Sequence, residues 1–187
     1  MNESTCVADH VSAVLTGLDG QPVYRNNMQI VGRVEVVLAG PDGKVKGRCV
    51  VENLVTAVGD QLYASRGAGL TSSAVPTGMK LGTGSTAVAK SGAGSALTTY
   101  LSGSNKAFDA TFPSATGGVA SYKRTYAAGE ATTASPITEC AIVTETISND
   151  DTSTEAETVS RALLTGIGSK GASDTLTITW THTILGA

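Results

Sequence analysis

Apolar and polar residues alternate strictly along residues 174–185, DTLTITWTHTIL. Successive side chains of a strand point to opposite faces, so this pattern predicts a long strand with one buried face and one wetter face. Threonines fill the wetter face, and their branched Cβ atoms favour extended backbone. The only tryptophan, Trp180, lies in the middle of the apolar face. We expect earlier segments of the chain to pair with this strand.

A hairpin followed by a helix is the clearest local pattern in the first half of the chain. Residues 27–38 (NMQIVGRVEVVL) and 45–54 (VKGRCVVENL) alternate like strands, and Pro41-Asp42-Gly43 between them is typical of a tight turn. Residues 56–66 (TAVGDQLYASR) predict a short helix with Thr56 as its N-cap. The expected apolar stripe of this helix consists of Val58, Leu62 and Tyr63.

The rest of the chain predicts one long loop and several short strands. Residues 83–104 are small and polar, which indicates a loop with at most one brief element near residues 97–101. Such a long loop needs a reason, and contact with a neighbouring subunit is a common one. Neither face of residues 136–147 is wholly apolar, so this strand is expected at a sheet edge or under uneven cover. The other predicted strands are residues 79–81, 106–112, 119–127 and 158–167.

These elements predict a mainly β fold, either an antiparallel β-sandwich or an open barrel, jelly-roll-like, with one short helix and an N-terminal arm. Residues 27–187 are expected to form a single β domain. Residues 1–26 differ, because their apolar positions have loose helical spacing and are too few for a stable isolated helix. Two interpretations of residues 1–26 stay open: an arm that docks on the domain or on a neighbouring subunit, and a frayed terminus.

Composition narrows the classes of partner. Only 16% of the residues are charged, well below the usual quarter, and small residues are abundant, which suits surfaces that meet other proteins. The net charge of −3 and the lack of a Lys/Arg cluster argue against direct nucleic-acid binding. No apolar run approaches the about 18 residues of a membrane span. The polar start, MNESTCVADH, does not resemble a secretory signal.

The cysteines do not form a recognisable metal or disulfide pattern. Cys6, Cys49 and Cys140 are far apart, and neither His10 nor His182 stands at ligand spacing from any of them. We expect reduced, partly buried thiols in a protein made in the cytoplasm. Their redox state after release into an oxidising medium stays open.

No catalytic, cofactor-binding or metal-binding residue is assigned, and the chain is predicted not to be an enzyme. Residues 82–87, GTGSTA, match G-x-G-x-x-G/A, but Gly92 and Gly94 follow too closely for a helix to open, so a turn leaving a strand is expected. No serine lies in a G-x-S-x-G elbow that could serve a histidine. His182 is therefore expected to be a hydrogen-bonded strand residue rather than a general base.

Two polar groups have a plain interpretation and a functional one. Asp150, Asp151, Glu155 and Glu157 lie in the acidic loop 149–157, which is expected to be a solvated surface, with calcium binding as the weaker alternative. The Tyr122/Lys123/Arg124/Tyr126 group could stack a base or a sugar. We favour the outer face of a strand for this second group.

Residues 30–187 resemble small virion proteins of tailed bacteriophages. The stretch GRVEVVLAGPDGKVKGRCVVENLVTAVGDQLYASR resembles their opening hairpin and helix, and TGMKLGTGSTAVAKSGAGSAL resembles a stretch common in tail-fibre and head-decoration proteins. ITECAIVT and DTLTITWTHTI resemble their closing strands. The chain departs from the pattern at Glu139-Cys140, where Glu-Ala-Gly is usual, and residues 1–26 have no counterpart in it.

The resemblance implies a non-enzymatic structural protein of the virion, most simply a capsid decoration or cement protein that bridges neighbouring capsomers. The alternative is a component of the tail, collar or fibre base, including a receptor-binding module that would need exposed aromatics such as Tyr100, Tyr122 and Tyr126. The implied partners are the major capsid protein or other virion proteins, and copies of the chain itself in a homo-oligomer, with a trimer expected. Residues 1–26 and 83–104 are expected to make the contacts between subunits.

Overall fold

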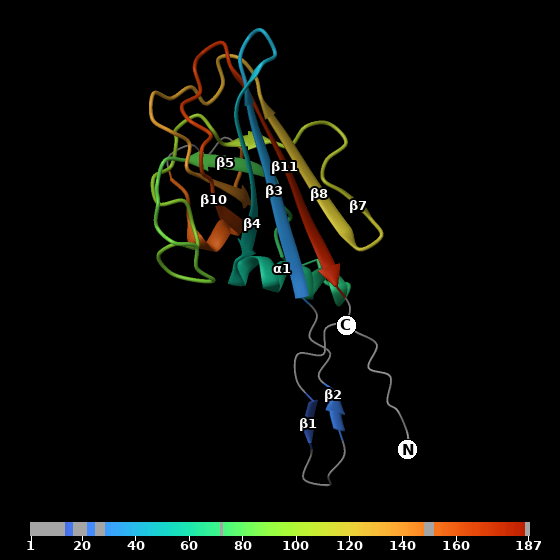
Figure 1. The fold of residues 1–187 in the computed structure, drawn as a ribbon. Coiled ribbons are helices and arrows are strands. Elements are labelled where there is room, and N and C mark those ends of the chain that lie inside the picture. The colour runs from blue at the N-terminus through green and yellow to red at the C-terminus, as the bar shows by residue number, and fades with distance from the viewer. Residues whose placement is uncertain (1–13, 17–21, 25–28, 72, 148–151, 186–187) are drawn as a thin grey trace, which may run out of the picture.

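The computed structural model describes residues 14–16, 22–24, 29–71, 73–147 and 152–185. Nine antiparallel strands form one sheet in the order β6-β5-β9-β10-β4-β3-β11-β8-β7, which curls into a half-barrel (Figure 1). The strands are β3 (Gln29–Ala39), β4 (Val45–Val55), β5 (Gly78–Gly82), β6 (Lys106–Ala107), β7 (Ser114–Thr116), β8 (Val119–Tyr126), β9 (Glu139–Val143), β10 (Thr158–Leu163) and β11 (Thr175–Leu185). The predicted mainly β, open-barrel class is confirmed.

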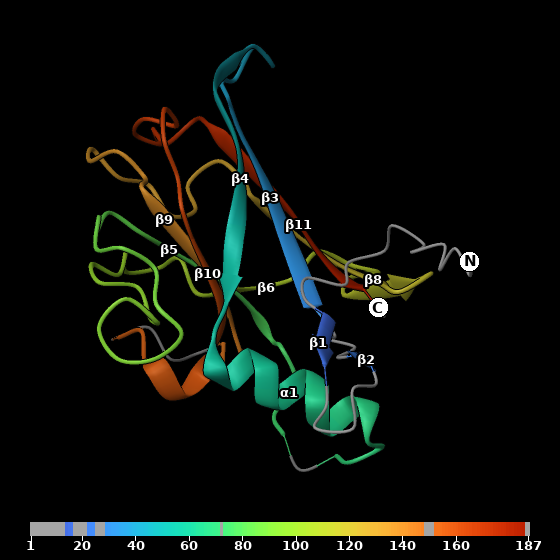
Figure 2. The ribbon, with the colours of Figure 1, turned by 60° about the horizontal axis from the view of Figure 1, so that its bottom comes forward.

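Helical structure is limited in the described residues to α1 (Ala57–Gly67) and the short 3₁₀ helix η1 (Glu155–Glu157). Figure 2 shows α1 lying across one end of the curled sheet, below the end of β4. The predicted N-cap is confirmed, because the Thr56 hydroxyl accepts the Gly59 N–H at 3.2 Å. Leu62 is buried as predicted, whereas Val58 and Tyr63 are only partly buried. None of the described helices is long and apolar enough to cross a membrane.

Strand β11 is the central strand of one half of the sheet, as its alternation predicts. It pairs along its length with β3 on one side and β8 on the other, so that Trp180 lies opposite Val34 and Tyr122. Trp180 and His182 are fully buried on its inner face. The predicted hairpin of β3 and β4 is also confirmed, with Gly43 at φ +76° in the turn.

The sheet bends where β4 changes partner. Most of β4 pairs with β3, but its last residues, Leu54 and Val55, pair with β10. The two halves of the sheet thus face one another and enclose one apolar core. The Tyr126 hydroxyl crosses this core and donates to the carbonyls of Met79 and Ser104, both at 2.9 Å. The bulk of the core is Val34, Val36, Leu38, Met79, Leu81, Ile137, Cys140, Ile142, Leu176, Ile178 and Trp180.

Several predicted elements differ in extent or position. Residues 136–147 yield only β9, and the expected edge position is wrong, because β9 lies between β5 and β10 and is buried on both faces. Of the strand predicted over residues 106–112, only β6 forms. Beyond it, the Asp109 carboxylate accepts the backbone N–H and the hydroxyl of Thr125 at 2.9 and 2.7 Å. Strand β7 was not predicted.

The described part of the N-terminal arm is a small hairpin of β1 (Val14–Thr16) and β2 (Pro22–Tyr24). Within the described residues these strands pair only with one another, outside the nine-stranded sheet. The interpretation of the apolar spacing as helical is therefore wrong for residues 14–16, which form a strand. The other apolar positions of that pattern, Val7, Val11 and Leu18, lie outside the described residues.

Candidate functional site

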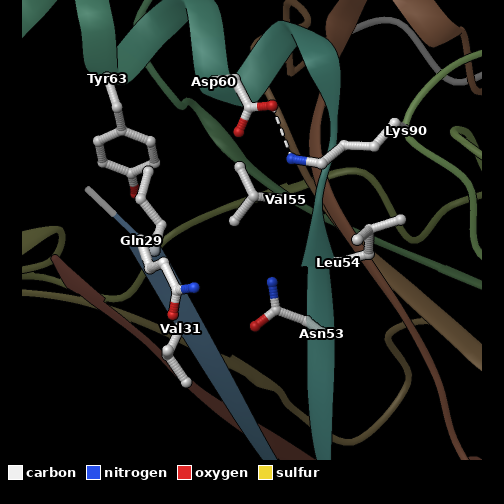
Figure 3. Close-up of a pocket in the computed structure, with 9 residues that line it drawn as sticks. Gln29, Val31, Asn53, Leu54, Val55, Asp60, Tyr63 and Lys90 are labelled. Atoms are coloured by element: carbon white, nitrogen blue, oxygen red, sulfur yellow. Dashed lines mark hydrogen bonds and ion pairs between the residues drawn. The ribbon is translucent and has the colours of Figure 1, made fainter. Parts of the chain in front are cut away.

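A pocket of about 500 Å³ opens between the start of β3, the end of β4 and α1 (Figure 3). Its apolar wall comes from the two strands and consists of Ile30, Val31, Leu54 and Val55. Its polar lining includes Asn53 and Tyr63. At the rim, Lys90 from the long loop forms a 2.6 Å ion pair with Asp60 of α1. Both of these side chains are about half exposed, so the pair contributes little stability by itself.

A hydrogen-bonded network of uncharged side chains lies beneath this pocket. His182 Nδ1 lies 2.5 Å from Tyr63 Oη, which lies 3.0 Å from Tyr122 Oη. On the other side of the ring, Asn53 Nδ2 lies 3.2 Å from His182 Nε2 and also donates to Ser160 Oγ. The expectation that His182 is a hydrogen-bonded strand residue is confirmed.

Burial fixes the protonation states of this network. It lowers the pKa of His182 from 6.5 to about 4, so the imidazole is neutral at pH 7. Burial also raises the pKa of Tyr63 and of Tyr122, which keeps both phenols protonated. With Asn53 donating to Nε2, the single imidazole proton resides on Nδ1 and is donated to Tyr63, which in turn donates to Tyr122. Each of these hydrogen bonds therefore has a donor and an acceptor while all the side chains of the network are neutral.

This arrangement joins α1 to the sheet rather than assembling a nucleophile. Ser160 Oγ donates to the carbonyl of Leu54 at 2.9 Å, not to the imidazole. Among the described residues no carboxylate is hydrogen-bonded to His182, so a Ser-His-acid relay is not formed there. Asn53 Oδ1 is buried without a hydrogen-bond partner in the described part of the chain. It lies so close to the Cα of Gly32 that a Cβ on that residue would be 1.6 Å away, which explains the glycine.

A second polar site fixes the long loop 83–104 to the sheet. Glu139 of β9 is fully buried, and its carboxylate accepts the backbone N–H groups of Gly84, Thr98 and Thr99 at 3.0, 3.2 and 2.9 Å. Arg161 of β10 donates to the same carboxylate through Nε at 3.0 Å and Nη2 at 2.5 Å. One carboxylate thus binds both ends of the loop and an arginine.

Arg161 holds the middle of the same loop. Its guanidinium donates to the carbonyls of Thr86 and Gly94, each at 2.9 Å, and the side chain is fully buried. The glycine of the G-x-G motif is required by this packing, because a Cβ on Gly84 would lie 2.0 Å from Thr98 Oγ1 and 2.6 Å from Glu139 Oε1. The predicted turn after β5 is confirmed, since no helix follows residues 82–87 and no dinucleotide fingerprint is formed.

The predicted outer-face position of the tyrosine group in β8 is wrong. Tyr122 and Tyr126 point into the core with exposed fractions of 4% and 0%. Arg124, on the same inner face, forms a 2.5 Å ion pair with Glu130. Tyr100, a residue of the long loop, is only partly exposed, and its ring covers Lys80. The three tyrosines therefore do not form an exposed stacking surface.

The acidic loop and the cysteines are only partly described. Asp150, Asp151, Cys6 and His10 lie outside the described residues. Glu155 accepts the Gly92 N–H at 2.7 Å, and Glu157 accepts the Thr154 hydroxyl at 2.8 Å. No group of three potential metal ligands occurs in the described part of the chain. Cys49 and Cys140 are free, buried thiols, and burial raises the pKa of Cys140, which keeps it protonated.

Three charged residues central to these sites were not recognised as site residues in the sequence. Lys80, Glu139 and Arg161 are each the only charged residue of a short strand, and all three are fully buried. A single charged residue in a short strand was the available signal, because such a charge requires a partner when the strand is buried.

Comparisons with protein-family models, curated proteins and solved structures find no match to the chain.

Proposed function

We propose that the protein is a structural component of a bacteriophage virion, a capsid decoration or cement protein that stabilises the head by bridging neighbouring capsomers. The observation that carries the proposal is a contact between two of the resembling motifs. The Glu139 carboxylate of ITECAIVT binds the Gly84 N–H of LGTGST at 3.0 Å. A third motif, DTLTITWTHTI, forms β11. Two motifs that bind one another in the folded protein support an architecture shared with virion proteins better than separate matches of small-residue strands do.

The long loop has the properties of a contact surface. Its backbone is fixed by Glu139 and Arg161, while its tips at residues 85–87 and 91–93 are exposed and made of Ser, Thr, Ala and Gly. A surface of short side chains on a fixed backbone loses little conformational entropy on binding. We propose that this loop and residues 1–26 contact neighbouring subunits, in a homo-oligomer that follows the local symmetry of the particle.

The copy number of the protein on particles tests this proposal. The purified chain is mixed with expanded, empty capsids, and bound protein is quantified per particle. A cement protein is expected at hundreds of copies, because it recognises a repeated lattice site and stabilises the lattice by binding only the assembled form. A few copies would favour the alternative location in the tail, collar or fibre base. Absence from both capsids and purified virions would contradict a virion role.

Deleting residues 1–26 is expected to abolish retention on the particle without unfolding the β domain. The nine-stranded sheet starts at Gln29, so every strand of the core remains in the truncated chain. Unfolding by urea should show the same midpoint as the full chain, while particle binding is lost. Full occupancy of particles by the truncated protein would contradict a bridging role for the arm.

A further inference from the structure

A buried amine and a buried carboxylate meet on the outer face of β5, beneath the long loop. Lys80 and Glu145 are both fully buried. Lys80 Nζ donates to Glu145 Oε2 and to the carbonyl of Thr152. Removing an ammonium and a carboxylate from water is costly, and apolar residues of similar volume are often as stabilising. A chemical role for this pair would explain why it occupies a dry site.

A carboxamide lies one strand away from this pair. Strands β5 and β6 pair Gly78 with Ala107 and Met79 with Lys106. The same antiparallel register, continued by one residue, places Lys80 opposite Asn105, so their side chains share a face of the sheet. Asn105 has an exposed fraction of 2%.

Tyr100 and the backbone beside Glu145 bring the three groups together. Lys80 Nζ lies 4.6 Å from the centre of the Tyr100 ring, and the hydroxyl of that ring accepts the Asn105 backbone N–H at 3.2 Å. The Asn105 side-chain amide donates to the carbonyl of Thr146, the residue after Glu145, at 3.0 Å. An amine, a carboxamide and a carboxylate thus share one water-poor site closed by an aromatic ring.

We propose that Lys80 and Asn105 form an intramolecular isopeptide bond, with Glu145 as the proton-transfer group. Glu145 takes a proton from the Lys80 ammonium, which the low local dielectric favours because both groups become neutral. The free amine turns from Glu145 and attacks Cγ of Asn105, forming a C–N bond. The attacking nitrogen, which carries one proton too many for an amide, gives that proton to Glu145 as Glu145 delivers its own proton to the departing amide nitrogen. The C–N bond to that nitrogen breaks, and ammonia leaves with no oxidant or cofactor consumed.

The bond would join two strand segments that are separated in sequence by the long loop. Residues 81–104 would lie in a covalently closed ring, whose ends could not separate even in the unfolded chain. This inference is independent of the virion proposal, because it concerns the chemistry within one chain.

Mass spectrometry of the full-length protein tests the bond directly. The intact mass under denaturing conditions is expected to lie about 17 Da, one ammonia, below the sequence mass. Trypsin does not cut after an acylated lysine, so residues 67–90 should be recovered as one peptide joined to residues 91–106. A succinimide at Asn105 would cost the same mass but would leave Lys80 cleavable. An intact mass equal to the sequence mass, with complete cleavage after Lys80, would overturn the proposal.

Substitutions assign the roles of Lys80 and Glu145. Lys80→Arg retains a cation beside Glu145 but lacks the nucleophilic amine, so the mass deficit should disappear. Glu145→Gln removes the proton acceptor and should also abolish the deficit. Lys44→Arg, at an exposed lysine that pairs with Asp42 at 3.2 Å, is the matched control and should keep it. A deficit that persists in Lys80→Arg would contradict this linkage, and the wild-type peptide result decides the question even if a variant fails to fold.

Discussion

Replacing Arg161 with methionine is expected to destabilise the protein by about 3–5 kcal/mol, because it leaves the Glu139 carboxylate buried without its cation. In the intact protein both side chains are fully buried, and Arg161 donates to Glu139 through two nitrogens. The variant also releases the carbonyls of Thr86 and Gly94. Urea unfolding followed by tryptophan fluorescence measures the loss, since Trp180 is in the core.

Two further variants separate the buried charge from the general effect of removing an arginine. Arg48→Met breaks an ion pair with Glu35, but Arg48 is 62% exposed, so the expected cost is below about 1 kcal/mol. The double variant Arg161→Met/Glu139→Gln removes both charges and should be more stable than Arg161→Met alone. If Arg161→Met lowered the free energy of unfolding no more than Arg48→Met, the role assigned to the Arg161–Glu139 pair in fixing the loop 83–104 would be wrong.

Acidification is expected to destabilise the protein through His182 by about 3 kcal/mol once the pH falls below 4. The pKa of His182 is about 4 in the folded protein and near 6.5 in the unfolded chain, because burial removes water that would stabilise the charged ring. A lowered pKa means that the unfolded chain binds a proton first as the pH falls. The stability contributed by the neutral ring is therefore complete above pH 6.5 and is lost progressively between pH 6.5 and pH 4.

His182→Gln isolates this contribution from that of the carboxylates, which is common to both proteins. Free energies of unfolding are measured for each at pH 7.5, 6, 5 and 4. The wild type should lose stability more steeply with falling pH, by up to about 1.4 kcal/mol per pH unit. The slope is informative even if glutamine lowers stability at every pH. Parallel curves for the two proteins would show that His182 titrates alike in the folded and unfolded states.

The sequence predicts the parts of this fold that local chemistry determines. The β3–β4 hairpin follows from two alternating segments and a Pro-Asp-Gly turn, and α1 begins at the hydroxyl residue expected to cap it. Strand β11 follows from its strict alternation. In each case the pattern and the turn or cap lie within a few residues of one another.

The polar sites could not be predicted because they depend on what covers each face. Period-2 alternation shows which residues of β8 share a face, but not that Tyr122 and Tyr126 face inward. Likewise, β9 is buried on both faces only because the loop 83–104 folds back over its outer side, and Glu139 holds it there. No local pattern within residues 136–147 encodes that cover.

The place of β11 in the sheet sets the order in which the protein can fold during synthesis. In chain order β11 is the last of the nine strands, yet it lies between β3, one of the first, and β8. Until the ribosome has released residues 175–185, β3 and β8 each have an open edge, and the apolar face that Trp180 covers is exposed. These edges and this apolar face stay uncovered in the nascent chain until residues 175–185 are available to pair. A chain cut short before β11 lacks the strand that joins β8 and β7 to the rest of the sheet.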